Sequence, residues 1–414
     1  MRLDLGDPGL LLREDVLADP YPLYDLLRRE APVWRVPGQD SYLVTDPALI
    51  RDVVARPHEF SSNLVSVLHR GDGNSLAAYG VTSFGDLNNT LATADPPVHT
   101  RHRRLLQPHL SPAAIHELTP MVARITDERL STLLGAGHGD FVTTVADPVP
   151  ARVIAEVIGL PPDDVPRLIS LVAATGALLD GVTDLDGMGQ AAAAALDLLV
   201  YSETQLGAAR QRPAADRVGL LAVVVDAIDS DAITAEEALS LLVLLINAGT
   251  ETTSSLLATA VRTLASAPSL QDQLRSEPGR IPDAIEDFLR DDGPFQFHYR
   301  WTPGDTTLGG VPIPASSRVL LMWAAANRPS PVAPDEGALA EAHTSKDKAP
   351  HFAFGRGIHF CIGAHLARLE SRIVLDRLLA GTTSLSLDPD HPPVRRVSVF
   401  LRRHTCLPVV LVSA

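Results

Sequence analysis

The residue in this chain best placed for chemistry is a cysteine inside a glycine-rich segment. The segment reads Phe354-Gly355-Arg356-Gly357-Ile358-His359-Phe360-Cys361-Ile362-Gly363. Its glycines allow positive φ angles and a close approach to a flat ligand. A helical pattern follows Cys361, so unpaired N–H groups and the positive end of a helix dipole favour a thiolate there. Such a thiolate can hold haem iron, whereas a cysteine without this context is more often a buried side chain in a turn.

A second group of reactive side chains lies inside a predicted long helix. Thr234 is a candidate N-cap, and Glu237 follows at the spacing of a capping box. The helical pattern continues almost to Pro268, which makes about 32 residues and ~48 Å. Inside it lies Ala248-Gly249-Thr250-Glu251-Thr252-Thr253. Burying a carboxylate among threonines is costly, and hydroxyls that bond backward loosen a helix. The segment would leave room for a diatomic ligand beside an acid and an alcohol, and a solvated helix bend is the alternative.

A third feature is a set of cations that would suit the two propionates of a haem. His99 and Arg103 are four residues apart and share one face of a predicted helix. Carboxylates such as propionates bind strongly to charged hydrogen-bond donors. Taken alone, this basic segment would be interpreted as a solvated helix face.

Together these segments resemble the cytochrome P450 family. The cysteine segment matches the family pattern Phe-Gly-x-Gly-x-(His/Arg)-x-Cys-x-Gly in full, and the threonine segment matches (Ala/Gly)-Gly-x-(Asp/Glu)-Thr-Thr. The resemblance covers nearly the whole chain in the right order. It implies a mainly α fold with small β-sheets, in which a long central helix lies over a buried haem b with the Cys361 thiolate as axial ligand.

The resemblance also implies roles for individual residues. Thr252 would stabilise the oxygen activated at the iron, and Glu251 would help to supply protons. The residues expected to hold the haem are His99, Arg103, Ala248, Arg300, Phe354, Gly355, His359 and Gly363. The residues expected to contact substrate, together with the segment 63–90, are Asn247, Phe295, Phe297, Val399 and Phe400. Asn247 is expected to bond substrate or ordered water, with a bond to a neighbouring helix as the alternative, and core roles for Phe295 and Phe297 are as well supported.

One structural motif of the family is altered in this chain. Aligned on Arg290, the carboxylate of the Glu-x-x-Arg motif is Asp287. Glu286, four residues before Arg290, could pair with it instead, but from a shifted face of the predicted helix. The family supplies a second arginine from the segment before the cysteine, but residues 330–354 contain none. The basic residues there are His343, Lys346, Lys348 and His351. We expect Asp287 and Arg290 to be structural, and the alteration to affect haem loading and local rigidity more than oxygen chemistry.

Helical patterns that would position these groups dominate residues 99–290. Short strands are predicted near both ends of the chain, beginning with a hairpin of 33–36 and 41–44. Further strands are predicted at 306–308, 319–322 and 397–412. Residues 60–93 are predicted to form a long irregular connection. Since no repeat or linker divides the sequence, we expect one domain over residues 1–414.

Bulk composition restricts the class of protein. The chain has 414 residues, of which 45% are hydrophobic and 21% charged, as in ordinary soluble proteins. The 35 basic and 50 acidic residues give a net charge of −15, which argues against binding to nucleic acid or to an acidic membrane. Two cysteines form no disulfide framework, and the acidic N-terminal segment is unlike a secretory signal. We expect a cytoplasmic monomer free of membrane.

The expected activity is a monooxygenation that uses O2 and electrons from a ferredoxin and its reductase, since no flavin or nicotinamide fingerprint is apparent. The substrate would be a small natural-product-like molecule, hydroxylated or epoxidised in secondary metabolism. The arginines expected to dock the ferredoxin are Arg101, Arg104, Arg356 and Arg368. One alternative is oxidative coupling of two substrates, such as tryptophan-containing cyclodipeptides. Another is a haem-binding protein without turnover, against which the intact Glu251–Thr252 pair argues.

Overall fold

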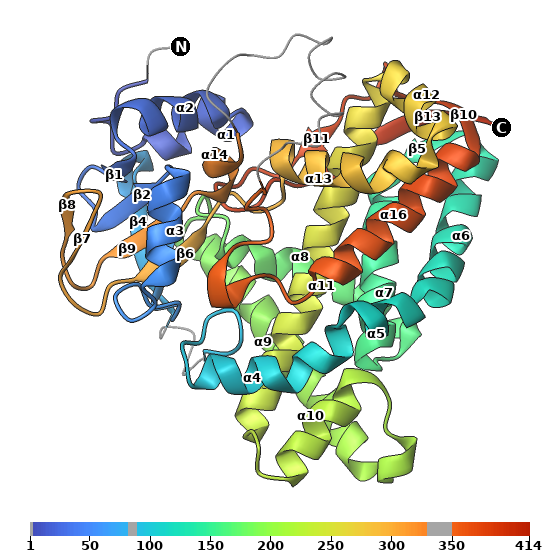
Figure 1. Ribbon diagram of the computed structural model, residues 1–414, viewed down its shortest axis with the longest axis horizontal. Helices are drawn as coiled ribbons and strands as arrows, with labels where there is room; N and C mark the ends of the chain where they lie inside the picture. Colours follow the sequence, from blue (N-terminus) through green and yellow to red (C-terminus); the bar gives the residue numbers. More distant parts are fainter. Residues whose placement is uncertain (1–2, 82–88, 329–349) are drawn as a thin grey trace.

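The computed structural model describes residues 3–81, 89–328 and 350–414 (Figure 1). Helices form most of it, as the sequence predicts. The helices before the central one are α1 (Glu14–Ala18), α2 (Tyr21–Glu30), α3 (Pro47–Ala55), α4 (Val98–Leu106), α5 (Pro112–Glu117), α6 (Thr119–Ala136), α7 (Pro148–Ile158), α8 (Val165–Thr175), α9 (Leu185–Gln211) and α10 (Gly219–Asp229). The remaining helices are α11 (Ala235–Ala265), α12 (Pro268–Ser276), α13 (Ile281–Asp292), α14 (Trp323–Asn327) and α16 (Ala364–Ala380).

The strands are short and form small sheets near the two ends of the chain. A four-stranded sheet has the order β1 (Val33–Arg35), β2 (Ser41–Val44), β9 (Arg318–Leu321) and β6 (His298–Trp301). A three-stranded sheet has the order β10 (Thr382–Leu387), β13 (Pro408–Ser413) and β5 (His138–Asp140). The two-stranded pairs are β3 (Ser66–Arg70) with β4 (Leu76–Gly80), β7 (Thr306–Leu308) with β8 (Val311–Ile313), and β11 (Val394–Arg395) with β12 (His404–Cys406).

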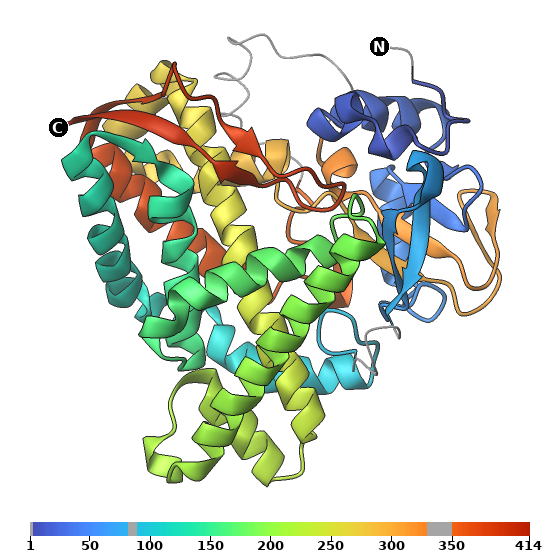
Figure 2. The same ribbon diagram turned by 180° about the vertical axis from the view of Figure 1, so that it is seen from behind.

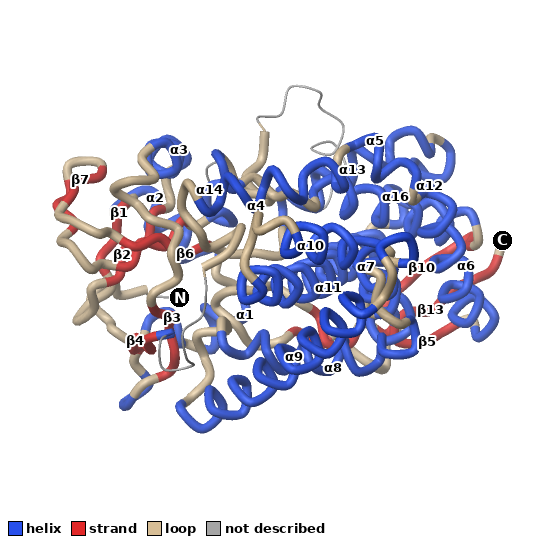
Figure 3. Tube along the Cα trace, turned by 90° about the horizontal axis from the view of Figure 1, so that it is seen from below, coloured by secondary structure: helices blue, strands red, loops and turns tan. Residues whose placement is uncertain are grey.

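Helix α11 is the central element of the helical part. Its Thr234 cap accepts from the Glu237 backbone while the Glu237 carboxylate accepts from the Thr234 backbone, so the predicted capping box is confirmed. The helix packs against α7, α8, α9, α13 and α16, and Figures 2 and 3 show it passing between them. By length and composition α11 could cross a membrane, but 67% of its most apolar 18-residue window is buried inside the protein. It is therefore the core helix of this fold.

The sequence predicted most helices and strands correctly, but it missed β5, β10 and the β3–β4 pair. The β1–β2 hairpin forms in register, with Val33 opposite Val44, and a helix follows Cys361 as predicted. Residues 60–93 are not a wholly irregular connection, because β3 and β4 pair as an antiparallel hairpin there. Four of the five β3 residues are buried, namely Ser66, Val67, Leu68 and His69. The prediction was wrong because burial against the N-terminal core overrides the weak local pattern.

Candidate active site

The Cys361 loop adopts the tight geometry that its glycines require. Gly355 and Gly357 have φ angles of 69° and 72°, in the region that side chains with a Cβ rarely adopt. The Cys361 backbone N–H donates to the Phe354 carbonyl at 2.9 Å. Helix α16 then begins at Ala364, with Gly363 as N-cap. The loop therefore presents Cys361 one short turn before a helix, as predicted.

Cationic and N–H groups surround the Cys361 sulfur. Burial raises the pKa of its thiol, while the Gly363 backbone N–H, Arg103 and Arg368 act in the opposite direction. Arg103, on α4, holds the loop itself: its Nη1 donates to the carbonyls of Ile358 at 3.2 Å and Phe360 at 2.7 Å. The family resemblance predicts that Arg103 binds a haem propionate. In the structure Arg103 also bonds to the cysteine loop. A bound metal cation would supply the further stabilisation that a buried thiolate needs.

Three predicted propionate ligands lie near one another: His99 and Arg300 are buried, and His359 is partly buried with its Nε2 bonded to the Ser62 hydroxyl at 2.8 Å. The rings of His99 and His359 lie 4.4 Å apart between centroids. Neither ring nitrogen of His99, nor Nδ1 of His359, has a well-formed hydrogen bond within the described residues. Arg300 is buried, forms no ion pair with any described residue, and donates through Nη1 to its neighbour's carbonyl at 2.7 Å. Burial lowers its pKa to about 10.

A buried guanidinium without a carboxylate is costly, and so are orphaned imidazole nitrogens. A ligand carrying carboxylates would satisfy all three side chains. These residues therefore fit the two propionates of haem, and Cys361 fits its iron. Phe354, Gly355 and Gly363 lie in the cysteine loop, where the resemblance expects them to border the ring.

The middle of α11 has one open face within an otherwise buried helix. Ala248 is exposed, and Asn247 and Thr252 are partly exposed. The Thr252 hydroxyl donates to the Ala248 carbonyl at 2.8 Å, which is the backward bond that the sequence predicts. The Asn247 amide nitrogen donates to the Val243 carbonyl at 2.8 Å. This bond lies within α11 itself, whereas the sequence predicted a bond to substrate or water, or to a neighbouring helix.

Glu251 points away from that open face into a buried ionic network. Arg403 Nη1 donates to Glu251 Oε1 at 2.7 Å, and Arg396 Nη1 donates to the same oxygen at 3.0 Å. Arg403 also binds Asp147 through Nη2 at 2.7 Å, and Arg396 binds Asp180 at 2.7 Å. Ser254 on α11 donates to Asp147. Both arginines lie on the C-terminal ribbon, defined here as residues 394–406.

This network contains three carboxyl groups and only two guanidinium groups. Burial raises the pKa of Glu251, and the charges of Arg403 and Arg396 oppose that rise. Burial likewise raises the pKa of Asp147 and of Asp180, opposed by Arg403 and Arg396 respectively. Like charges that share a buried site favour retention of a proton. The network is therefore suited to hold a proton next to the threonine segment.

The altered family motif is rebuilt with different partners. Arg290 Nη1 pairs with Asp287 at 2.7 Å, as the alignment predicts. Glu286 makes a two-pronged pair with Arg368 on α16, at 2.6 and 2.8 Å, and accepts from His351 at 3.0 Å. Arg368 was expected to dock a ferredoxin. In the structure its pair with Glu286 instead connects α16, the helix that follows Cys361, to α13. His343, Lys346 and Lys348 lie outside the described residues.

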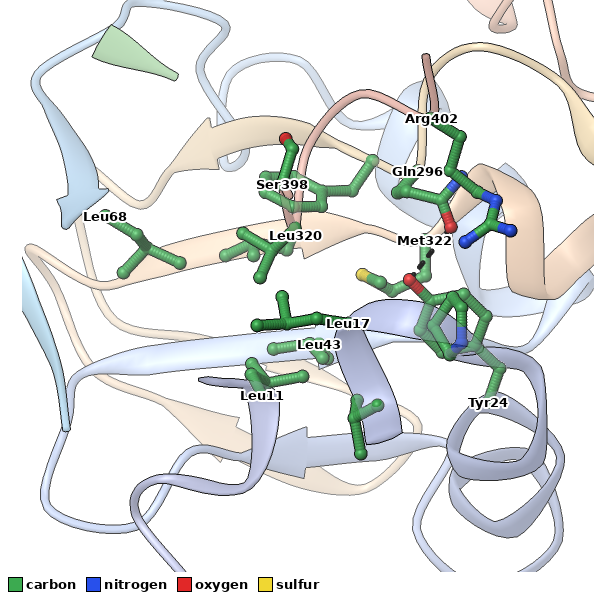
Figure 4. Close-up of a pocket in the computed structure, with 14 residues that line it drawn as sticks. Leu11, Leu17, Tyr24, Leu43, Leu68, Gln296, Leu320, Met322, Ser398 and Arg402 are labelled. Atoms are coloured by element: carbon green, nitrogen blue, oxygen red, sulfur yellow. Dashed lines mark hydrogen bonds between the residues drawn. The ribbon is translucent and has the colours of Figure 1, made fainter. Parts of the chain in front are cut away.

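Four predicted substrate residues pack together in one hydrophobic cluster: Phe295, Phe297, Val399 and Phe400. Phe297 is fully buried and its ring centroid lies 5.3 Å from that of Phe400, while Phe295 lies 5.1 Å from Phe400. Val399 contacts Gly181, since a Cβ there would lie 2.4 Å from it. A nearby cavity of about 20 Å³ is lined in part by Phe297 and Val399, and Figure 4 shows the side chains around it. That volume holds about one water molecule, so this cavity is no substrate pocket. The segment 82–88 lies outside the described residues.

Sequence reasoning missed the arginines of the C-terminal ribbon. Arg396 and Arg403 lie 145 and 152 residues from Glu251 along the chain, so no local pattern connects them. The available signal was the need to compensate a carboxylate predicted to be buried, together with a run of arginines in a segment predicted as strands.

Comparison with known proteins agrees with this site. The sequence pattern of the family described as Cytochrome P450 matches residues 205–396. The chain is 35% identical over 381 residues to Cytochrome P450 144 of Mycobacterium tuberculosis, covering 92% of this chain and 86% of that protein. It is 34% identical over 392 residues to Cytochrome P450 monooxygenase PikC of Streptomyces venezuelae, covering 93% and 88%. The structure of CxnD, a cytochrome P450 enzyme for C–S bond formation in chuangxinmycin biosynthesis, superposes with a TM-score of 0.82 at 26% identity, covering 95% and 98%.

The chain belongs to the cytochrome P450 family. It has the family's mainly helical fold with small sheets, and it is an oxidoreductase of the monooxygenase type with a haem-thiolate cofactor. It takes a small-molecule substrate and electrons from redox partners.

Proposed function

We propose that this P450 inserts one oxygen atom into a small natural-product-like substrate, by hydroxylation or epoxidation, in secondary metabolism. Cys361 is the iron ligand, and His99, Arg300 and His359 bind the propionates. When bound, the haem supplies oxygen activation. The residues of the chain hold the cofactor, present Thr252 at the open face of α11 and keep a protonatable carboxyl group behind it.

The observation that carries this proposal is the arrangement around Glu251 and Thr252. The Thr252 hydroxyl lies on the partly exposed face of α11, while the adjacent Glu251 is 8% exposed and held by two arginines. Rotated away from the Ala248 carbonyl, this hydroxyl can donate a hydrogen bond to a polar ligand, and an acid behind it can renew the proton. A protein that only bound haem would have no use for this costly pair.

The test is the Thr252→Ala variant, assayed with a redox system and a substrate found by spectral screening of the ferric protein. We expect NADPH consumption to continue while product per NADPH falls by about tenfold or more, with hydrogen peroxide released. Thr263→Ala, at the far end of the same helix, is the matched control, because Thr263 makes the same type of backward bond to Thr259 at 2.9 Å. Equal product yield from both variants would contradict the proposed role.

We propose a ferredoxin as electron donor, docking on the face formed by α4, α5 and α16. Figure 1 shows these helices on one side of the molecule. Of the arginines expected there, Arg101 pairs with Glu237, Arg356 donates to the Pro350 carbonyl at 3.0 Å, and Arg368 pairs with Glu286. Arg104 is exposed without an ion pair among the described residues, and so is Arg372, which borders a groove of about 260 Å³ beside α5.

Arg104→Glu combined with Arg372→Glu should raise the KM for an acidic ferredoxin by about tenfold, with a weaker salt dependence. Arg210→Glu on α9, which lies on the opposite side of the molecule (Figure 2), should leave that KM unchanged. An unchanged KM in the double variant would exclude this docking face.

The alternative reaction, oxidative joining of two substrates, is separated from oxygen insertion by the mass of the product. A product one oxygen atom heavier than the substrate supports the proposal, and a joined product without added oxygen supports coupling. CxnD shows only that a P450 of this fold serves C–S bond formation. We further propose that residues 1–414 fold as one domain that acts as a cytoplasmic monomer, without binding nucleic acid or membrane.

A further inference from the structure

A second group of arginines lies on the other side of the C-terminal ribbon, away from Glu251. Successive side chains of an extended segment point to opposite sides, and the ribbon is closed by the Arg396 N–H bond to the Arg403 carbonyl at 2.9 Å. Arg396 and Arg403 therefore face the Glu251 network, whereas Arg395 and Arg402 face Asp292 at the end of α13.

Three guanidinium groups converge on this one carboxylate. Arg402 Nε donates to Asp292 Oδ1 at 2.7 Å, and Arg395 Nη2 donates to Oδ2 at 2.6 Å. Arg262, in the last turn of α11, lies with Nη2 at 3.8 Å from Oδ2. The Tyr21 hydroxyl donates to Oδ1 at 3.1 Å. Within the described chain none of the three arginines pairs with another carboxylate, so two positive charges remain unbalanced.

Several donors of this cluster lack partners. Arg262 Nε and Arg395 Nη1 are buried atoms without a hydrogen bond among the described residues, as is Nδ1 of the neighbouring His404. Burial together with Arg395 and Arg262 lowers the pKa of His404 to about 3, so the imidazole adds no charge. The side chains of Arg262 and Arg395 are 36% and 25% exposed, which leaves solvent access from one side.

Aromatic and polar groups pack against the buried side of the cluster. Arg328 lies over the Tyr21 ring, 3.3 Å from its centroid, and donates to the Asp291 carbonyl at 2.9 Å. Figure 4 shows Arg402 extending beside Gln296 toward Tyr24, whose hydroxyl donates to Gln296 at 3.1 Å. These contacts fix Arg402 on the buried side of the cluster, while Arg262 and Arg395 are its partly exposed members.

We propose that Arg262, Arg395 and Arg402 form a binding site for a phosphate dianion, either inorganic phosphate or the phosphoryl group of a monoester. Guanidinium groups prefer planar, two-pronged contacts with phosphate oxygens, and a dianion balances the two excess charges. Occupation would tie the end of α11, the end of α13 and the C-terminal ribbon together. The site is separate from the haem site and from the residues that carry the oxygen chemistry.

The test is calorimetric titration of the haem-loaded protein with inorganic phosphate, at constant ionic strength set by chloride. We expect saturable binding of one equivalent and a higher Tm in phosphate than in chloride. Arg262→Gln and Arg395→Gln should each weaken binding by about tenfold. The matched control is Arg210→Gln, an exposed arginine on α9, which should bind phosphate as the unmodified protein does.

A parallel titration with glycerol 3-phosphate separates the two sources of the group. Tighter binding of the ester assigns the site to a phosphorylated metabolite, and weaker binding assigns it to free phosphate. If Arg395→Gln does not fold, Arg395→Lys keeps the charge but loses the two-pronged contact, and its phosphate affinity should still fall. The proposal would be overturned if the phosphate titration gave no saturable heat above that of a chloride titration. Unchanged phosphate affinity in both Arg262→Gln and the Arg395 variant would also overturn it.

Discussion

Arg403 joins Glu251, in the middle of α11, to Asp147, next to the start of α7. One of its nitrogens lies 2.7 Å from Glu251 Oε1 and the other 2.7 Å from Asp147 Oδ2. The Arg403 side chain is 7% exposed, so it is a buried cation shared by two buried acids. The carboxylate proposed to supply protons is therefore fixed by a segment that lies at the far end of the chain.

Arg403→Gln should reduce both stability and coupling. Removal of one partner from a buried charge network leaves uncompensated charge and costs about 3–5 kcal/mol. Chemical denaturation of the ferric protein measures the first effect, and product per NADPH measures the second. Arg217→Gln, which breaks a pair with the exposed Asp226 and Asp229, should leave the free energy of unfolding nearly unchanged, because surface ion pairs contribute little. Equal losses in the two variants would argue against a buried network.

Gly176, which follows α8, allows the chain to pass close to this network. A Cβ at Gly176 would lie 2.8 Å from Glu251 Oε2 and 3.0 Å from Arg396 Nη1. Gly176→Ala should therefore destabilise the protein by about 1–3 kcal/mol and lower product per NADPH. The control is Gly189→Ala on α9, where a Cβ would meet nothing within 4 Å and the helix should gain up to about 1 kcal/mol.

The Glu286 pair predicts a specific dependence of stability on pH. Burial alone would raise the pKa of Glu286, but hydrogen bonds from Arg368 and His351 outweigh it and lower the pKa from 4.5 to about 2. A lowered pKa stabilises the fold at pH values above the ordinary pKa, and the effect is lost as pH falls toward the lowered value. The difference in unfolding free energy between the unmodified protein and Glu286→Gln should therefore shrink as pH falls from about 5 to about 2. A difference that stays constant with pH would show that the pair does not form.

Arg300 should control how firmly the cofactor is held. Loss of a buried charged donor to a propionate should speed haem transfer to an excess acceptor protein by about 10–100-fold in Arg300→Gln. Arg35→Gln is the control, because Arg35 pairs with Asp40 on the surface with 57% of its side chain exposed. Identical transfer rates would remove Arg300 from the propionate site.

The sequence predicted those parts of the site that are encoded locally. The Cys361 loop and the Thr234 capping box depend on residues within a few positions of each other, and both form as predicted. The backward bond of Thr252 is likewise local.

The partners of the buried acids could not be predicted in the same way. Glu286 finds Arg368 at 82 residues' distance, and Glu251 finds Arg403 at 152. Such pairs are set by how α11, α13, α16 and the C-terminal ribbon pack, and no periodicity reports that packing. The β3–β4 hairpin was missed for a related reason, since its stability comes from burial of residues such as Val67.

The central claim is that Cys361 is the thiolate ligand of the haem iron, and its most direct test is the absorption spectrum of the reduced protein with carbon monoxide. The unmodified protein and Cys406→Ser should both show the strongly red-shifted Soret band of thiolate ligation, and Cys361→Ser should lose it. Cys406 is a suitable control because it is the other cysteine of the chain, half-buried in β12. A red-shifted band that persists in Cys361→Ser, or is absent from the unmodified protein loaded with haem, would contradict the assignment.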